Sequence, residues 1–220
     1  MPPATHVAMT ADADYYANHF LKMRFPWSLY HRPIVSELAS AIREAKGPRI
    51  LNVGSGPFVE FDEVALPDRE FSICDIDERA IELAKKTYGA RLSAAEVIKV
   101  GSPFPFQSNS FDLVVAMEVI EHVIDPLPWL VELLRVARPG GELFLTTPNY
   151  GSWSLRAIES TVLEVVARRN GFSRKGIHPT PMTRKRLQDV LLEAGAVGTR
   201  IHTLSQGWVL ASHSQKPKVD

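Results

Sequence analysis

Disulfide bonding and excess charge of either sign are both absent from this chain. Its 220 residues include one cysteine, Cys74, and they carry 25 basic and 25 acidic side chains, so the formal net charge is zero. One cysteine cannot form an internal disulfide, which is typical of a reducing compartment, and a neutral chain has no overall field that would attract nucleic acid. Nucleic acid is therefore an unexpected partner, and Cys74 is expected to be a small core residue.

Long hydrophobic runs are absent as well. Residues 1–13 are polar and contain prolines, unlike a secretory signal peptide. No stretch approaches the roughly 20 apolar residues that are needed to cross a bilayer. We therefore expect a cytoplasmic protein that makes no membrane contact and acts as a monomer or a homodimer.

What the chain does contain is an alternation of β-prone runs and helical patterns. This alternation predicts an α/β fold, a Rossmann-like doubly wound sheet of seven strands with helices on both faces. The sheet is expected to be mostly parallel, with an antiparallel C-terminal hairpin joined by Ser205 and Gln206. Strands are expected at residues 49–53, 70–74, 96–100, 111–117, 142–147, 196–204 and 207–212. Helices are expected at residues 29–45, with Ser28 as a candidate cap and Pro33 in the early turns, and at residues 77–86, 126–137, 153–169 and 184–192, with a short one between 57 and 67.

The stretch from Arg49 to Gly56 is the centre of this pattern. An apolar strand runs directly into a turn that contains two glycines, Gly54 and Gly56, which let the backbone approach a ligand closely. Asp75 ends the next strand, where a carboxylate typically binds ribose hydroxyls. The pairing predicts a nucleotide-type cofactor site, and an ordinary β-turn is the alternative.

The motifs along the chain then form an ordered series. They read Ile50-Leu51-Asn52-Val53-Gly54-Ser55-Gly56, Asp75, Ser110-Phe111-Asp112-Leu113-Val114-Val115, Glu118-Val119-Ile120-Glu121-His122, Arg138-Pro139-Gly140-Gly141-Glu142-Leu143 and Thr146-Thr147-Pro148-Asn149. This series resembles the class I S-adenosylmethionine-dependent methyltransferases. Within that class it is similar to the group with a Glu-Val-Ile-Glu-His motif, which includes ubiquinone-biosynthesis O-methyltransferases and small-RNA 2′-O-methyltransferases. The resemblance covers residues 49–150 and, more loosely, 178–195.

The sequence contains no internal repeat and no linker, so we expect one domain over residues 1–220, made of four parts. Residues 1–47 would form an N-terminal cap arm and helix, residues 48–150 the cofactor-binding core, residues 151–182 a substrate-side insert, and residues 183–220 a C-terminal helix and hairpin. The implied cofactor is S-adenosyl-L-methionine. The implied cofactor-binding residues are Asn52, Gly54, Ser55, Gly56, Asp75, Ile76, Ser102 and Met117.

Three residues in the cofactor region depart from the usual family pattern. Asn52 occupies the position of an acid, and Ser102 follows the third strand where an acid usually contacts the adenine amino group. Phe58 occupies the position of a third glycine, so we expect the loop to leave its usual course or to be partly plugged. These departures also leave open a non-catalytic relative that binds the cofactor.

The turn after the fourth predicted strand carries the candidate catalytic residues, His122 and Glu118. Residues three and four apart share a face of a helical turn, and the resemblance to metal-dependent members implies that Glu118, Glu121, His122 and His178 could bind a divalent cation such as Mg²⁺ or Zn²⁺. The alternatives are a metal-free role for His122 as a general base and a purely structural role. A metal at these residues would favour RNA 2′-O-methylation as the function. The zero net charge argues against an RNA substrate.

Aromatic residues supply the candidate substrate pocket. The predicted substrate residues are Tyr15, Tyr16, Trp27, Tyr30, Asn149 and Tyr150. Together, the ordered motif series and these aromatic residues favour O-methylation of a small-molecule acceptor. A nicotinamide-dependent dehydrogenase is a further alternative, but the first helix after the glycine turn is too short for it.

Overall fold

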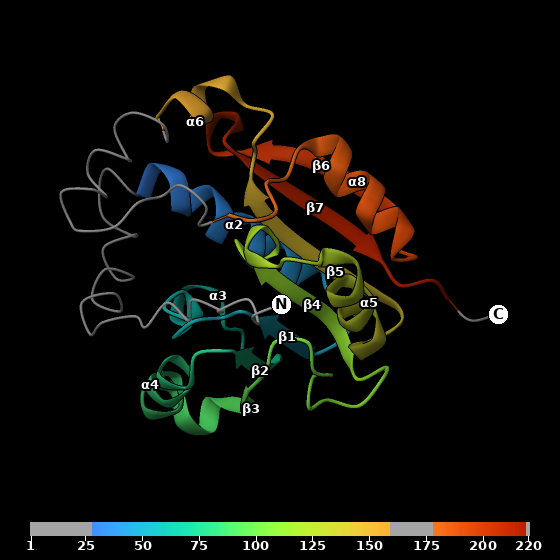
Figure 1. Ribbon diagram of the computed structural model, residues 1–220. Helices are drawn as coiled ribbons and strands as arrows, with labels where there is room; N and C mark the ends of the chain where they lie inside the picture. The colour runs from blue at the N-terminus through green and yellow to red at the C-terminus, as the bar shows by residue number, and fades with distance from the viewer. Residues whose placement is uncertain (1–27, 159–177, 219–220) are drawn as a thin grey trace, which may run out of the picture.

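The computed structural model describes residues 28–158 and 178–218. Its seven-stranded sheet has the order β3-β2-β1-β4-β5-β7-β6 (Figure 1). The strands are β1 (Arg49–Val53), β2 (Glu70–Asp75), β3 (Leu92–Val97), β4 (Phe111–Met117), β5 (Ala137–Pro148), β6 (Val197–Leu204) and β7 (Val209–Gln215). Strands β1 to β5 pair in parallel, and β7 pairs antiparallel with both β5 and β6. The predicted sheet and its antiparallel C-terminal hairpin are confirmed.

Helices cover both faces of this sheet. They are α2 (Ser28–Glu44), α3 (Phe61–Val64), α4 (Glu78–Tyr88), α5 (Pro126–Val136), α6 (Trp153–Ile158) and α8 (Arg184–Glu193), with 3₁₀ turns η1 (Gly89–Arg91), η2 (Ile120–His122) and η4 (Ser205–Gly207). Apolar residues of α2, α3 and α4 share one buried cluster with one face of the sheet, whereas those of α5 and α8 share a second cluster with the other face. Among the described helices, none is long and apolar enough to cross a membrane.

Strand β4 shows why this core could be predicted from sequence. Residues Phe111 to Ala116 are all buried, because a central parallel strand with helices on both sides has no face toward water. Consecutive residues then serve opposite clusters: Val114 packs with α5 and α8, and Val115 packs with α2, α3 and α4. The run is apolar except for Asp112, and it therefore predicts both the strand and its central place.

Three strands differ from the prediction, and one of them, β7, is Val209–Gln215 rather than residues 207–212. The third strand was expected at residues 96–100, but β3 is Leu92–Val97. It lies at the edge of the sheet and pairs only with β2 among the described strands. An edge strand buries little side-chain surface, so the small residues Ala94 and Ala95 can form its middle and no apolar run marks it in the sequence. Strand β5 was expected to begin after the turn at residues 139–141, yet it starts at Ala137. The register against β4 shifts there, so the turn is a bulge within the strand.

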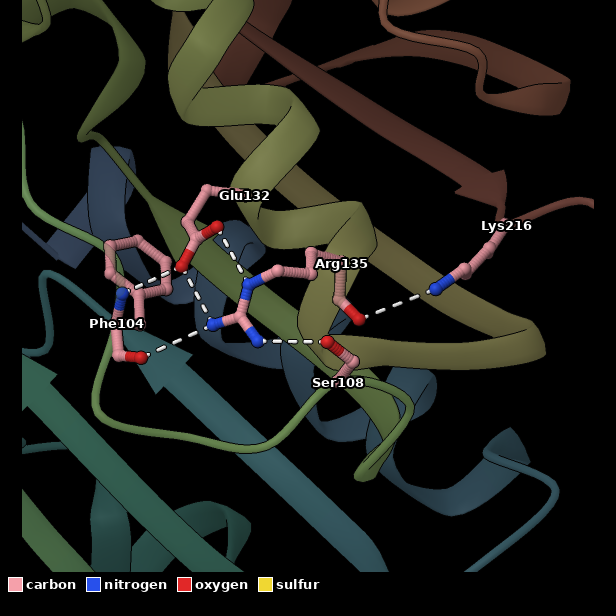
Figure 2. A network of polar contacts seen from close by, with 5 residues as sticks. All are labelled: Phe104, Ser108, Glu132, Arg135 and Lys216. Atoms are coloured by element: carbon pink, nitrogen blue, oxygen red, sulfur yellow. Dashed lines mark hydrogen bonds and ion pairs between the residues drawn. The ribbon is translucent and has the colours of Figure 1, made fainter.

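A polar network fastens the loop before β4 to helix α5. Arg135 makes two hydrogen bonds of 2.8 and 2.7 Å to the Glu132 carboxylate, donates to the Phe104 carbonyl, and reaches Ser108 at 3.1 Å. Glu132 in turn accepts the Phe104 backbone N–H at 2.6 Å (Figure 2). Lys216, which follows β7, binds the Arg135 carbonyl. The network therefore joins a proline-containing loop, a helix and the end of the last strand.

The helix termini largely follow the sequence signals. The Asp77 side chain caps α4 by accepting the Arg79 N–H, and the Thr183 side chain caps α8 by accepting the Arg186 N–H. Pro126 is the first residue of α5, as expected for proline, but the Asp125 side chain makes no capping hydrogen bond. The proline ring, rather than a side-chain cap, is thus the local feature that favours the start of α5.

Candidate functional site

The order of strands places the reversal of the sheet between β1 and β4. In open α/β sheets, ligands bind beyond the carboxyl ends of the strands at such a reversal. The segment that follows β1 starts with Gly54, and the segment that follows β4 starts with Glu118. A cofactor site is therefore expected to lie between these two segments.

The glycine turn after β1 has a backbone that only glycine adopts readily. Gly54 and Gly56 have φ angles of 68° and 53°, in the left-handed region. The Gly54 N–H binds the Cys74 carbonyl of β2 at 2.8 Å. A Cβ atom at Gly54 would lie 2.6 Å from Cγ2 of Val119. The glycine turn and the turn after β4 thus pack directly against each other.

The Asp75 carboxylate closes the other side of this loop. One oxygen accepts the Gly56 N–H at 2.7 Å and the other accepts the Asp77 N–H at 2.9 Å. Burial raises the pKa of the Asp75 carboxyl above its ordinary value, against the lowering effect of these two donors. Each carboxylate oxygen still has a lone pair to accept a further hydrogen bond, so Asp75 suits a ligand with two neighbouring hydroxyls.

The remaining predicted cofactor residues occupy different environments. Asn52 is 2% exposed, and neither polar atom of its side chain has a hydrogen-bond partner among the described residues. Leaving such a group unsatisfied costs about 1–3 kcal/mol, so this buried amide fits a site completed by a bound polar ligand. Ile76 is 62% exposed beside Asp75, which suits an apolar contact to a planar base. Met117 is half-buried, while Ser55 is partly buried and Ser102 is exposed.

Phe58 does not plug the cofactor loop. Its φ angle is 51°, so it keeps the left-handed conformation that a glycine would favour. Its side chain is 1% exposed and packs against the rings of Phe61 and Phe71, with centroid distances of 5.3 and 6.2 Å. The expectation of a partly plugged loop is therefore wrong, because the aromatic ring turns into the core beneath the loop.

Glu118 directly follows β4 in a strained conformation. Its φ angle is 55°, which is uncommon for a residue with a side chain and is often found at functional sites. Its backbone N–H binds the Thr146 carbonyl of β5 at 2.9 Å. Its carboxylate accepts a hydrogen bond of 2.7 Å from the Tyr30 hydroxyl of α2. Helix α2 thus contributes a side chain to the candidate site.

Three of the four predicted metal ligands lie together. Glu121, His122 and His178 each place one ligand atom within 4.8 Å of the others, and the two imidazole rings meet edge to face at 4.8 Å. Glu121 is 1% exposed and accepts the Thr147 hydroxyl at 2.9 Å. The side chain of His122 is 46% exposed. Glu118 does not belong to this group and faces Tyr30 instead.

The predicted substrate residues divide into three sets. Tyr15, Tyr16 and Trp27 lie outside the described residues. Tyr30 reaches Glu118, and the Tyr150 hydroxyl forms a hydrogen bond with Nδ1 of His178. Asn149 instead has a structural contact, because its side-chain amide donates to the Gly207 carbonyl at 2.8 Å. The Oδ1 atom of Asn149 accepts the Gly151 N–H, so this side chain fastens the turn after β5.

Sequence reasoning missed two residues that shape the site. Thr147 binds the buried Glu121 carboxylate, and Ser205 donates its hydroxyl to the Tyr30 carbonyl and so holds α2 in place. The motif around Thr147 was recognised, but the direction of its side chain was not. No local signal in the sequence links Ser205 to a helix 175 residues earlier.

A doubly wound sheet of this order, with a glycine turn after β1 and a carboxylate after β2, is typical of the class I S-adenosylmethionine-dependent methyltransferases. The chain has this fold and this arrangement of residues. Residues 51–145 match the family model described as methyltransferase domain, and this range contains the glycine turn, Asp75 and the Glu118–His122 turn.

Two curated relatives with methyltransferase names are similar to this chain. The chain is 31% identical over 120 residues to a ubiquinone biosynthesis O-methyltransferase of Xanthomonas oryzae pv. oryzae, covering 53% of this chain and 50% of that relative. It thus spans about half the length of this relative. A ubiquinone biosynthesis O-methyltransferase of Neisseria meningitidis is 28% identical over 175 residues, covering 76% of this chain and 73% of the relative.

Two solved structures resemble the whole described fold. One is a chain of the complex that contains the Haloferax volcanii Trm112 methyltransferase activator, with a TM-score of 0.71, 14% identity, and coverage of 94% of this chain and 96% of that chain. The other is a SAM dependent methyltransferase from Aquifex aeolicus, with a TM-score of 0.59, 17% identity, and coverage of 86% and 97%. At these identities the likeness concerns the fold alone.

Proposed function

We propose that this protein transfers the methyl group of S-adenosylmethionine to a hydroxyl oxygen of a small molecule. The observation that carries the proposal is the packing of two turns at the sheet reversal. The glycine turn and the turn that holds Glu118 and His122 meet at Gly54 and Val119, which brings cofactor-type and acid–base-type groups to one edge of the sheet. The names of the curated relatives, which are O-methyltransferases, support the same reaction class.

The residues present fit the cofactor. Asp75 would accept the ribose hydroxyls, the glycine turn would lie under the methionine part, and Ile76 would pack against adenine. The buried Asn52 amide, which has no partner among the described residues, would gain one from a bound ligand or an ordered water. When bound, S-adenosylmethionine supplies a methyl carbon that is already activated by the sulfonium.

The chain's own task is then to align the acceptor and to accept its proton. A histidine titrates near neutral pH and is suited to act as a base. The His122 side chain is half-exposed, and its Nε2 atom lies 4.0 Å from the buried Glu121 carboxylate. We infer that His122 accepts the proton from the attacking hydroxyl and that Glu121, held by Thr147, stabilises the resulting imidazolium. A phenol is the favoured acceptor, because its hydroxyl is far more acidic than that of an aliphatic alcohol.

The test is the formation of S-adenosylhomocysteine from S-adenosylmethionine with a panel of phenols. We expect His122→Asn to lower kcat about 10²–10⁴-fold and to leave the cofactor Kd unchanged. The loss should shrink as the phenol becomes more acidic, which a merely structural role would not produce. A variant that retains the wild-type rate with every phenol at every pH would exclude His122 as the base.

A metal-dependent RNA 2′-O-methyltransferase is the second candidate. The grouping of Glu121, His122 and His178 favours it, whereas the zero net charge and the turn of Glu118 toward Tyr30 do not. This reading expects methyl incorporation into RNA that is abolished by a chelator and by His178→Ala. Methylation of phenols in the presence of chelator supports the metal-free reaction instead.

A further inference from the structure

A second group of metal-ligating side chains converges between α2 and the β6–β7 hairpin. The Glu37 carboxylate oxygen Oε1 lies 2.9 Å from Nε2 of His213 and 3.2 Å from Nε2 of His202. The three ligand atoms all lie within 4.8 Å of one another. These residues line a cavity of about 390 Å³, and none of them belongs to the site proposed for methyl transfer.

The fold explains why the two histidines face the same helix. Arg200 pairs with His213 and His202 pairs with Ala211 across the antiparallel β6–β7 ladder. His202 and His213 are therefore diagonal neighbours on one face of the sheet, close enough for long side chains to meet. Their rings are nearly parallel, at 10° and with centroids 5.8 Å apart. The ring of His213 also packs 4.9 Å from that of Phe144 in β5, which limits its movement.

This donor set and its spacing match a zinc ion. One carboxylate and two imidazoles are typical protein ligands of Zn²⁺, and ligand atoms at the usual bond lengths of a tetrahedral ion stand about 3.3–3.4 Å apart. The two oxygen-to-nitrogen distances of 2.9 and 3.2 Å approach this spacing, so small side-chain shifts are enough. The side chains are partly buried, with exposures of 27% for Glu37, 44% for His202 and 25% for His213.

From this geometry we infer a Zn²⁺ site formed by Glu37, His202 and His213, with water as the fourth ligand. Arg200 lines the same cavity, and its positive charge opposes the metal. Its side chain is exposed at the sheet edge and is free to turn toward solvent, whereas Glu44, also at the cavity, adds negative charge. The ion would join the middle of α2 to strands β6 and β7, so its binding would stabilise the contact between the helix and the hairpin.

The test is calorimetric titration of the full chain with zinc chloride after removal of metal by a chelator. Because Glu121, His122 and His178 could also bind the ion, the reference protein is the His122→Ala/His178→Ala variant. We expect this reference protein to bind one equivalent of Zn²⁺ and to gain thermal stability from it. Adding Glu37→Gln or His202→Ala to the reference should weaken binding more than about tenfold and remove the thermal shift.

Two controls make the outcome decisive. His202 is the most exposed of the three ligands, so His202→Ala is expected to keep the Tm that the reference protein has without metal, and any loss of binding then reports the site. Cobalt(II) in place of zinc should give the visible absorption of tetrahedral coordination. Absence of binding to the reference protein, or unchanged affinity after both Glu37→Gln and His202→Ala, would overturn the inference and leave the group as a hydrogen-bonded carboxylate with two imidazoles.

Discussion

Single residues at the candidate site have backbone angles that their neighbours enforce. Gly54 and Gly56 have positive φ, and so do Phe58 and Glu118, although they carry side chains. A left-handed conformation costs an ordinary residue roughly 1–2 kcal/mol, so surrounding contacts must offset this. The buried ring of Phe58 and the hydrogen bonds of Glu118 supply such contacts. Strain of this kind concentrates at functional sites, which agrees with the place of the two turns.

Gly54→Ala is the sharpest test of this packing. The new methyl group would lie 2.6 Å from Cγ2 of Val119, so the turn that carries Glu118 and His122 must shift. We expect a loss of at least about 2 kcal/mol in the free energy of unfolding, measured with denaturant, from backbone strain and displacement together. Gly198→Ala is the matched control, because Gly198 has a similar φ of 63° with open space around its Cβ position. Equal losses in the two variants would contradict the predicted contact.

Asp75 predicts how cofactor affinity depends on pH. Only the carboxylate can accept hydrogen bonds from two ribose hydroxyls while it also holds the N–H groups of Gly56 and Asp77. Because burial raises the pKa of the Asp75 carboxyl, protonation begins at a higher pH than for a free aspartate, and affinity falls as the pH drops through that range. Asp75→Asn should weaken S-adenosylhomocysteine binding about 10–100-fold at neutral pH and flatten the pH profile. Calorimetry at several pH values measures both, and an unchanged acidic decline in the variant would assign the decline to another group.

At the scale of elements, the Glu132–Arg135 pair is the best-defined stabilising contact. Burial acts on the Glu132 carboxyl to raise its pKa, but the hydrogen bonds from Arg135 and the Phe104 N–H outweigh it, so the pKa lies below its ordinary value. A carboxyl whose pKa is lowered by folding contributes stability above its unfolded pKa, and this contribution is lost as the pH falls through the folded value. Helix α5 and the loop at Phe104 are therefore expected to loosen first in acid.

Glu132→Gln tests this contact. The variant should lose about 1–2 kcal/mol in the free energy of unfolding at neutral pH. The difference from wild type should shrink as the pH falls below the ordinary pKa of 4.5 and vanish below the lowered pKa of the folded state. Lys185→Gln is a suitable comparison, because the Lys185–Asp189 pair is short, at 2.5 Å, but 85% and 58% exposed. That exposed pair should contribute less than about 0.5 kcal/mol. A comparable loss in the two variants would show that exposure does not separate these pairs.

The elements that sequence predicts well are those in which local chemistry and burial agree. Strand β4 is a nearly continuous apolar run, and Thr183 is a capping residue in front of a periodic helix, so both could be located. Strand β3 was placed several residues too late, because an edge strand buries little and leaves no apolar run. The start of β5 was also misplaced, since the bulge at residues 138–141 depends on its register against β4.

In the candidate site, too, the local motifs could be predicted from the sequence and the long-range contacts could not. The glycine turn, Asp75 and the Glu118–His122 turn are local motifs, and the structure brings the two turns together. The contacts of Tyr30 with Glu118 and Ser205 were beyond prediction because they join residues 88 and 175 positions apart. The same holds for the group of Glu37, His202 and His213. Its histidines could be paired from the hairpin, but the placement of α2 against that hairpin follows only from packing of the whole core.

For the whole molecule, α2 is the element that links the sheet edge to the candidate active site. Near its start, Tyr30 binds Glu118 through the hydroxyl and Ser205 of η4 through the carbonyl. Farther along, Glu37 meets His202 and His213, about 10 Å away at the helical rise per residue. Figure 1 shows α2 passing across the sheet that carries both groups. The position of α2 thus affects the Tyr30 side chain, whose hydroxyl contacts Glu118 in the strained turn after β4.

Tyr30→Phe separates the two roles of this residue. The variant keeps the carbonyl that accepts the Ser205 hydroxyl and loses the hydrogen bond from the Tyr30 hydroxyl to the Glu118 carboxylate, so the free energy of unfolding should fall by about 1–2 kcal/mol. If Tyr30 orients Glu118 for the proposed methyl transfer, kcat should fall at least tenfold while the Kd for S-adenosylhomocysteine stays constant. Ser205→Ala is the counterpart, because it removes the hydrogen bond that holds α2 and keeps the Tyr30 hydroxyl. It should lower the free energy of unfolding more than Tyr30→Phe does, and lower kcat less. If Tyr30→Phe instead lowers the free energy of unfolding more and kcat less than Ser205→Ala does, the Tyr30 hydroxyl serves to hold the helix and does not set the geometry of the turn.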